Sequence, residues 1–210
     1  MKTYQPILTN LDSIDALTDT TALTIRCHRA AIDLSPLMRL PKLRSLSIWD
    51  VRMGDLAPVA ALTELKRLSL SPAFLIDDLR ALSGLRQLEE LEICGDPSLM
   101  DLSPIAGLNR LRSLNLMLCE RVSDISPLSG MVEMETLSLY ECSKVADLTP
   151  LSKMTKLREL YLNDCWRVPV PLREAVEDGD YDRFRRLLNA SASSSPRSTD
   201  AYQQGSITKI

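Results

Sequence analysis

Aromatic residues, glycine and histidine are scarce in this chain of 210 residues. Only 4% of the residues are aromatic, there are 7 glycines, and His28 is the single histidine, whereas 45% of the residues are hydrophobic. The core is therefore expected to be aliphatic, mostly leucine. No P-loop, G-x-S-x-G or H-E-x-x-H motif is present, so the sequence carries none of these signatures of an enzyme.

Long apolar runs and an excess of positive charge are also missing. No stretch approaches the ~18 uninterrupted apolar residues of a membrane helix, and the first residues lack the apolar run of a secretory signal. A formal net charge of -3 and a pI near 5.3 give no electrostatic reason to expect nucleic-acid binding. We expect a cytoplasmic protein with reduced cysteines, although export by a route without a cleaved signal would leave the same sequence.

A repeat of about 23 residues organises most of the chain. Its markers are DLSPL at Asp33, DLAPV at Asp55, DLRAL at Asp78, DLSPI at Asp101, DISPL at Asp124 and DLTPL at Asp147. These are separated by 22, 23, 23, 23 and 23 residues, and NLDSI at Asn10 fits one step earlier. Seven repeats therefore fill residues 10–169. Units of this kind stack and share one continuous core.

Each repeat predicts a short strand and a helical return. The strand is an L-x-L pair at Leu23/Ile25, Leu46/Ile48, Leu68/Leu70, Leu91/Ile93, Leu114/Leu116, Leu137/Leu139 and Leu160/Leu162. Its two apolar residues face inward and the residue between them faces solvent. Ser35, Ser103, Ser126 and Thr149 each precede a proline, which predicts a hydroxyl N-cap on a short helical turn.

The consensus L-x-x-L-x-L-x-x-C/N resembles the leucine-rich repeat. VSDISPLSGM, from Val122, resembles in particular the short repeats of internalins, and the chain is also similar to a leucine-rich phosphatase regulatory subunit. The resemblance implies an α/β solenoid, with a parallel sheet on a concave face, helical turns on a convex face, and protein binding on the concave face.

Three of the cysteines follow the same repeat spacing. Cys119, Cys142 and Cys165 take the position that usually holds an asparagine in such repeats, as do His28, Val51, Ala73 and Asp96. We interpret them as inward packing residues rather than as metal ligands, because a straight row supplies neither a tetrahedral arrangement nor a fourth ligand. Cys94 alone is expected to face outward. The regularly spaced aspartates are expected to bond local backbone N–H groups rather than a cation.

Bulky and charged side chains on the predicted concave face are the candidate partner-binding residues. They are Trp49, Met117, Tyr140, Tyr161, Glu92, Arg26, Arg67 and Asn163. Trp and Tyr are enriched at interface hot spots. The alternative is that they are ordinary exposed residues, since isolated apolar side chains occur on any protein surface. With Glu90 and Glu159, Glu92 favours a partner that carries Lys or Arg.

The two ends of the chain differ from the repeats. Residues 1–9 are an N-terminal edge segment. In residues 170–190, Leu172, Ala175 and Val176 predict one amphipathic helix, and Tyr181, Phe184, Leu187 and Leu188 predict a second. This pair is expected to cap the last repeat on Leu160 and Leu162. Residues 191–210 are too polar to fold and are expected to be a disordered tail.

The sequence thus predicts a monomeric, non-catalytic module that needs no cofactor and binds a protein partner. A narrower alternative is a regulatory or inhibitory subunit of an enzyme such as a phosphatase, as the second resemblance implies. An alternative from another class is an enzyme that uses Cys94 as its nucleophile, although the pattern places no activating base beside that thiol.

Overall fold

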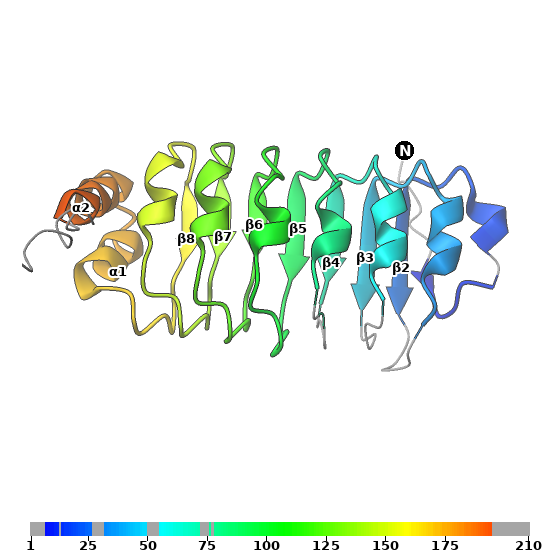
Figure 1. The fold of residues 1–210 in the computed structure, drawn as a ribbon, viewed down its shortest axis with the longest axis horizontal. Helices are drawn as coiled ribbons and strands as arrows, with labels where there is room; N and C mark the ends of the chain where they lie inside the picture. The colour runs from blue at the N-terminus through cyan, green and yellow to red at the C-terminus, as the bar shows by residue number, and fades with distance from the viewer. Residues whose placement is uncertain are drawn as a thin grey trace, which may run out of the picture.

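One parallel sheet runs the length of the computed structural model, with its eight strands in chain order (Figure 1). The structure describes residues 7–12, 14–26, 32–49, 55–71, 76 and 78–194, with only the backbone of 192–194. The strands are β1 (Ile7–Leu8), β2 (Ala22–Arg26), β3 (Ser45–Trp49), β4 (Arg67–Leu70), β5 (Glu90–Ile93), β6 (Ser113–Asn115), β7 (Thr136–Ser138) and β8 (Glu159–Tyr161).

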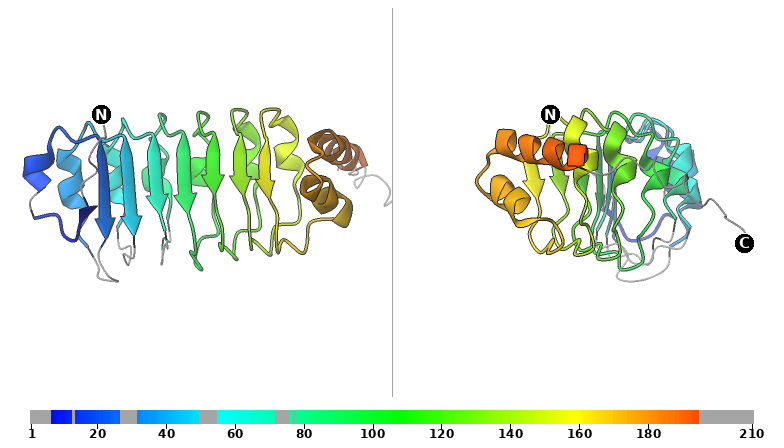
Figure 2. Two further views of the ribbon diagram at one scale, coloured as in Figure 1. Left: turned by 180° about the vertical axis from the view of Figure 1, so that it is seen from behind. Right: turned by 60° about the vertical axis from the view of Figure 1, so that its left-hand side comes forward.

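Short 3₁₀ helices return the chain on one side of this sheet. They are η1 (Ile14–Leu17), η2 (Ser35–Arg39), η3 (Ala57–Ala61), η4 (Arg80–Leu82), η5 (Ser103–Ile105), η6 (Ser126–Gly130) and η7 (Thr149–Lys153). Two α-helices follow, α1 (Val170–Glu177) and α2 (Tyr181–Ser194). In the view from behind (Figure 2, left) the strands lie in front of these 3₁₀ helices. The face of the sheet turned away from the 3₁₀ helices therefore carries no helices.

Equivalent residues of successive repeats pair across the sheet. Leu23 pairs with Leu46, and Leu46 pairs with Leu68, each in parallel register. The same register continues through Leu91 and Leu114. Strands stack in this register because the repeat spacing returns the same position to the same height in each turn. The predicted L-x-L strands and the solenoid are confirmed.

The inward leucines form one core along the whole molecule. Leu46, Leu114 and Leu137 are fully buried, and they belong to a single cluster that extends from Leu11 to Leu188. Full burial of one such side chain stabilises the fold by about 1.5–3 kcal/mol. Because no repeat buries its leucines alone, the core depends on the stacking of neighbours.

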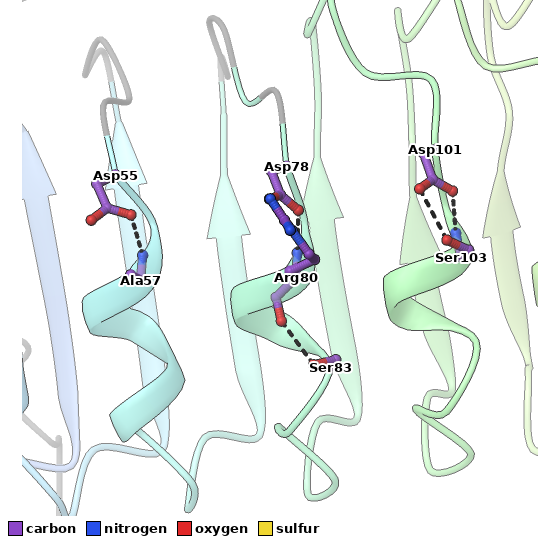
Figure 3. Close-up of polar contacts among 7 residues, drawn as sticks. All are labelled: Asp55, Ala57, Asp78, Arg80, Ser83, Asp101 and Ser103. Atoms are coloured by element: carbon purple, nitrogen blue, oxygen red, sulfur yellow. Dashed lines mark hydrogen bonds and ion pairs between the residues drawn. The ribbon is translucent and has the colours of Figure 1, made fainter.

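The 3₁₀ helices are capped differently from the sequence prediction. The predicted cap, the hydroxyl of Ser35 and its equivalents, makes no capping bond, because this residue is already the first of the helix. Instead the aspartate two residues before it accepts the backbone N–H, for example Asp101 Oδ1 from Ser103 N at 2.8 Å. Figure 3 shows this contact at Asp55, Asp78 and Asp101. The local role predicted for the aspartates is confirmed.

The cysteine position is buried as predicted. Cys119, Cys142 and Cys165 are fully buried, and each thiol donates to a backbone carbonyl of the preceding repeat. Cys142 Sγ, for example, lies 3.1 Å from the carbonyl oxygen of Leu116. His28, Val51 and Ala73, placed in the same row by the sequence, lie outside the described residues.

Asp96 fills the cysteine position one repeat earlier. It is fully buried, and its carboxylate accepts the N–H groups of Ile76 (2.7 Å), Ser98 (2.7 Å) and Leu99 (3.2 Å). A buried carboxylate is tolerated when several donors satisfy it. Asp96 therefore stabilises the turn after its strand, and the buried cysteines occupy the same position in the next three repeats.

Additional elements flank the repeats at the two ends of the solenoid. At the first end β1 pairs with β2, so residues 7–8 of the predicted edge segment 1–9 add a strand. At the other end α1 and α2 lie beyond β8 (Figure 1), with Leu172, Ala175, Phe184 and Leu188 buried. The predicted helical cap is confirmed.

The second cap helix is longer than the segment 170–190 assigned to the cap. Helix α2 continues to Ser194, four residues into the segment 191–210 that the sequence assigns to a tail. Residues 195–210 lie outside the described residues.

Candidate protein-binding surface

The sheet face without helices, called the open face here, displays the residues that alternate with the buried leucines. It corresponds to the concave face of the sequence prediction. Between the two inward residues of each strand lies a small or polar side chain, such as Ser47, Ser69, Asn115 or Ser138, each half-buried. A partner can approach such a low polar floor closely.

Arg26 and Trp49 lie together at the β2–β3 end of the open face. The guanidinium carbon of Arg26 is 4.7 Å from the centre of the Trp49 ring. Trp49 is 39% exposed, and the guanidinium group of Arg26, stacked over it, orients its ring. The pair therefore presents one flat amphipathic surface rather than two separate side chains.

The middle of the open face carries charge. Arg67 is exposed and lies 3.9 Å from the carboxylate of Glu90 on the next strand. Glu92 is half-buried, and its carboxylate accepts hydrogen bonds from Ser69 Oγ (3.0 Å) and Cys94 Sγ (3.5 Å). Arg67 and Glu92 thus each interact with a side chain of a neighbouring strand.

A groove lies on the open face over β6, β7 and β8. Met117, Tyr140 and Tyr161 line it, and its volume is about 340 Å³. Ser113, Asn115, Thr136, Ser138, Leu114 and Glu159 complete the lining. Tyr161 is 46% exposed, while Met117 and Tyr140 are half-buried. Three of the predicted residues therefore line the same groove.

Carboxylates flank this groove. Glu159 accepts bonds from Thr136 Oγ1 and Tyr161 Oη, both at 3.4 Å. The negative charge of Glu141 raises the pKa of Tyr140, to which partial burial and Asp164 add. Tyr140 therefore stays protonated at neutral pH and is available as a hydrogen-bond donor.

The eight predicted residues do not form one contiguous patch. Arg26 and Trp49 lie on β2 and β3, Arg67 and Glu92 on β4 and β5, and Met117, Tyr140 and Tyr161 on or beside the last three strands. Asn163 is exposed and lines a different pocket, beside the cap helices.

The outward placement predicted for Cys94 is wrong. The residue is only 3% exposed, and burial, reinforced by the charge of Glu92, raises the pKa of its thiol to about 12. Cys94 follows β5 directly, and its thiol donates to the carboxylate of Glu92 at 3.5 Å. A buried protonated thiol is a poor nucleophile, which removes the basis for an enzyme that uses Cys94.

The structure adds two negative findings within the described part of the chain. No group of three or more His, Cys, Asp or Glu side chains there is arranged to hold a metal ion. Among the same residues, no helix has both the length and the apolar character needed to cross a membrane.

Sequence reasoning missed a set of contacts between neighbouring repeats. Lys66 pairs with Glu89 (2.8 Å), and Arg112 pairs with Glu135. In both pairs the partners are 23 residues apart, which is the length of the repeat. That spacing between opposite charges was the signal available in the sequence.

Comparison with known proteins supports the fold. No protein-family profile matches the chain, and no curated protein sequence matches it. The structure is similar to that of an internalin, InlF, from Listeria monocytogenes, with a TM-score of 0.64 and 28% identity over 74% of this chain and 48% of that one. This chain thus spans about half the length of InlF.

Two further Listeria monocytogenes structures are similar. Internalin C2 gives a TM-score of 0.61 and 26% identity over 77% of this chain and 69% of that one. InlJ, whose functional domain includes a cysteine ladder, gives 0.52 and 20% identity over 70% of this chain and 36% of that one. The chain is a leucine-rich-repeat solenoid whose structural neighbours are internalins and other leucine-rich-repeat proteins.

Proposed function

We propose that this protein is a non-catalytic binding module that holds a protein partner on its open face. The observation that carries the proposal is the groove over β6–β8, where Met117, Tyr140 and Tyr161 surround a floor of small hydroxyl and amide side chains. Large, amphipathic side chains around a low floor are the composition found at interface hot spots.

The repeats themselves do not require these side chains. Equivalent positions on other strands hold Ser47, Ser69 or Ser71, and the leucine core is complete without an aromatic residue on the open face. Trp49, stacked on Arg26, is proposed as a second anchor at the other end. A partner that touches both anchors would extend along the sheet.

The identity of the partner distinguishes a general binding module from the narrower proposal of a regulatory subunit. If the partner is an enzyme, such as a phosphatase, the chain acts as its regulatory or inhibitory subunit. In either case we propose that it works as a cytoplasmic monomer, with the carboxylates of Glu92 and Glu159 facing Lys or Arg of the partner.

The test is affinity capture from native lysate with matched variants. The bait carries Trp49→Ala and Tyr140→Ala, and the control bait carries Met38→Ala, because Met38 is 57% exposed but belongs to η2 on the helical side. Circular dichroism checks that each bait is folded. We expect a specific protein to be retained by the wild type and the control and lost by the double variant. Equal retention by all three would contradict binding on the open face.

A further inference from the structure

Directly after the last strand lie backbone donors whose counterparts are used in the two preceding repeats. Leu116 N donates to Ser138 O, and Leu139 N donates to Tyr161 O, each at 2.9 Å. The equivalent amide one repeat later belongs to Leu162, and no strand follows β8 in the part of the chain that the structure describes. The Leu162 amide has no acceptor among the described residues.

A second donor follows two residues later. Leu118 N donates to Tyr140 O, and Glu141 N donates to Asn163 O, both at 2.9 Å. Their equivalent is the amide of Asp164, which also has no acceptor within the described part of the chain. Two donors spaced by two residues on one edge are the pattern that receives an added strand.

The cap helices satisfy only the first part of this edge. Tyr181 Oη accepts the amide of Leu160 at 2.8 Å, and Arg185 Nη2 donates to the carbonyls of Thr155 (3.1 Å) and Leu157 (3.2 Å). These side chains take the place of a following repeat up to Leu160. The described residues of the cap make no such bond with Leu162 or Asp164.

A pocket lies beside the uncovered part of the edge. It has a volume of about 320 Å³ and is lined on one side by Leu160, Leu162 and Asn163 and on the other by Arg173, Val176 and Tyr181. We call it the β8 notch. It is of the size of a small ligand pocket, and its walls combine apolar surface with polar groups.

One guanidinium group of the notch favours an occupant that carries a carboxylate. Arg158 and Arg173 both line the notch, and neither forms a salt bridge with the described residues. Glu159 and Glu177 also line the notch, so its formal charges balance, but the buried Nε of Arg173 has no hydrogen-bond partner among the described residues. Together with the backbone donors, the Arg173 guanidinium complements carbonyl and carboxylate oxygens.

We propose that the β8 notch binds a short, extended segment of a partner protein that carries a carboxylate side chain. Its backbone carbonyls accept the amides of Leu162 and Asp164, which continues the sheet beyond β8, and one of its carboxylates faces Arg173. This interaction is separate from the proposed role of the open face, although Tyr161 borders both sites.

The donors are tested first, by amide hydrogen exchange followed by NMR. We expect the amide of Leu162 to exchange much faster than that of Leu139, which donates to Tyr161 O within the sheet. Equal protection of the two amides would overturn the proposal, because the Leu162 amide would then already have an acceptor.

Binding is then measured by titrating the labelled protein with a short peptide of alternating valine and aspartate. We expect saturable shifts of the Leu162 and Asp164 amides, and none with the matching valine–lysine peptide. Arg173→Gln should weaken binding about tenfold, since a charge-assisted bond is lost. Arg186→Gln, the same change of charge at an exposed residue of α2, should leave binding within about twofold.

Two other results would overturn the proposal. One is the absence of saturable shifts in the wild type. The other is a set of shifts centred on Tyr140, which lines the groove but not the notch. A Tyr140→Ala variant, which leaves the notch intact, should bind the peptide like the wild type even if the open face proves to have no partner.

Discussion

One backbone position of the repeat requires a left-handed conformation. Gly95 has φ 75°, Leu118 has φ 64°, Glu141 has φ 58° and Asp164 has φ 61°, and they occupy the same position in four successive repeats. Side chains with a Cβ are disfavoured in this region, whereas glycine adopts it readily. The later repeats therefore carry strain that the repeat with Gly95 does not.

Exchanging glycine and a larger residue at this position should move stability in opposite directions. Gly95→Ala is expected to lower the free energy of unfolding by about 1 kcal/mol. Leu118→Gly is expected to raise it slightly, because glycine removes the strain and Leu118, which is 36% exposed, loses little burial. Urea denaturation measures both. Gly84→Ala is the control, since a Cβ there meets nothing within 4 Å, and it should not destabilise the protein. A destabilised Leu118→Gly variant would show that the leucine side chain outweighs the strain.

The buried thiols make the protein sensitive to alkali. Burial raises the pKa of Cys142 from 9.0 to about 12 and that of Cys119 to about 11. Between the ordinary pKa of 9.0 and these raised values, the unfolded chain releases thiol protons that the folded chain keeps. The free energy of unfolding therefore falls as the pH rises above about 9.

A serine at position 142 isolates this effect. Cys142→Ser keeps a donor for the carbonyl of Leu116 but does not titrate in this range. We expect its unfolding free energy, measured by urea denaturation from pH 8 to pH 11, to fall less steeply than that of the wild type. Parallel curves would mean that this thiol does not contribute to the alkaline loss.

At the scale of the secondary-structure elements, each 3₁₀ helix depends on its aspartate cap. Asp124 Oδ1 accepts the amide of Ser126 at 2.8 Å. This bond lowers the pKa of Asp124, with a smaller contribution from the Ser126 hydroxyl. The stabilisation is thus present above the ordinary pKa of 3.8 and is lost as the pH falls through the lowered value.

Replacing this cap should distinguish the acceptor from the charge. Asp124→Ala removes both and is expected to lower the urea midpoint at pH 7, whereas Asp124→Asn keeps an acceptor oxygen and should lower it less. The difference between wild type and Asp124→Asn should shrink at pH 3. If the alanine variant is as stable as the wild type, the cap contributes nothing measurable.

The elements show how far the sequence alone predicts the structure. The period fixed each strand, because inward residues such as Leu46 and Leu68 must pair in register to share a core. It failed at Cys94, which is only 3% exposed although Met117 and Tyr140 at the equivalent position are half-buried. It also misplaced the helix cap, since Ser35 begins η2 and Asp33 accepts its amide at 2.9 Å.

The candidate site was predictable only in part. The register placed Met117, Tyr140 and Tyr161 on one face of the sheet, but their gathering into one groove depends on side-chain directions that a repeat pattern does not specify. The β8 notch was not predictable, because it depends on how far α1 and α2 extend along the edge of the last strand. The packing of two α-helices against a strand occurs only once in this fold, so the repeat pattern does not predict it.

At the scale of the whole molecule, the solenoid depends on its cap. Phe184 of α2 is 1% exposed, and α2 contacts η7 of the last repeat. Phe184→Ala is expected to destabilise the protein by about 3–5 kcal/mol. Because each repeat contacts only its neighbours, amide exchange should accelerate most around β8 and least around β3. A uniform acceleration would show that the solenoid opens as one unit.

The most direct test of the central claim, that the open face binds a protein partner, is site-specific photo-crosslinking in native lysate. A photoreactive phenylalanine analogue replaces Tyr140 in the groove in one sample and Met38 on the helical side in the other. We expect one dominant crosslinked protein from position 140 that is absent from position 38, identified by mass spectrometry. A dominant crosslink from position 38 with none from position 140 would contradict the claim and place the partner on the helical side.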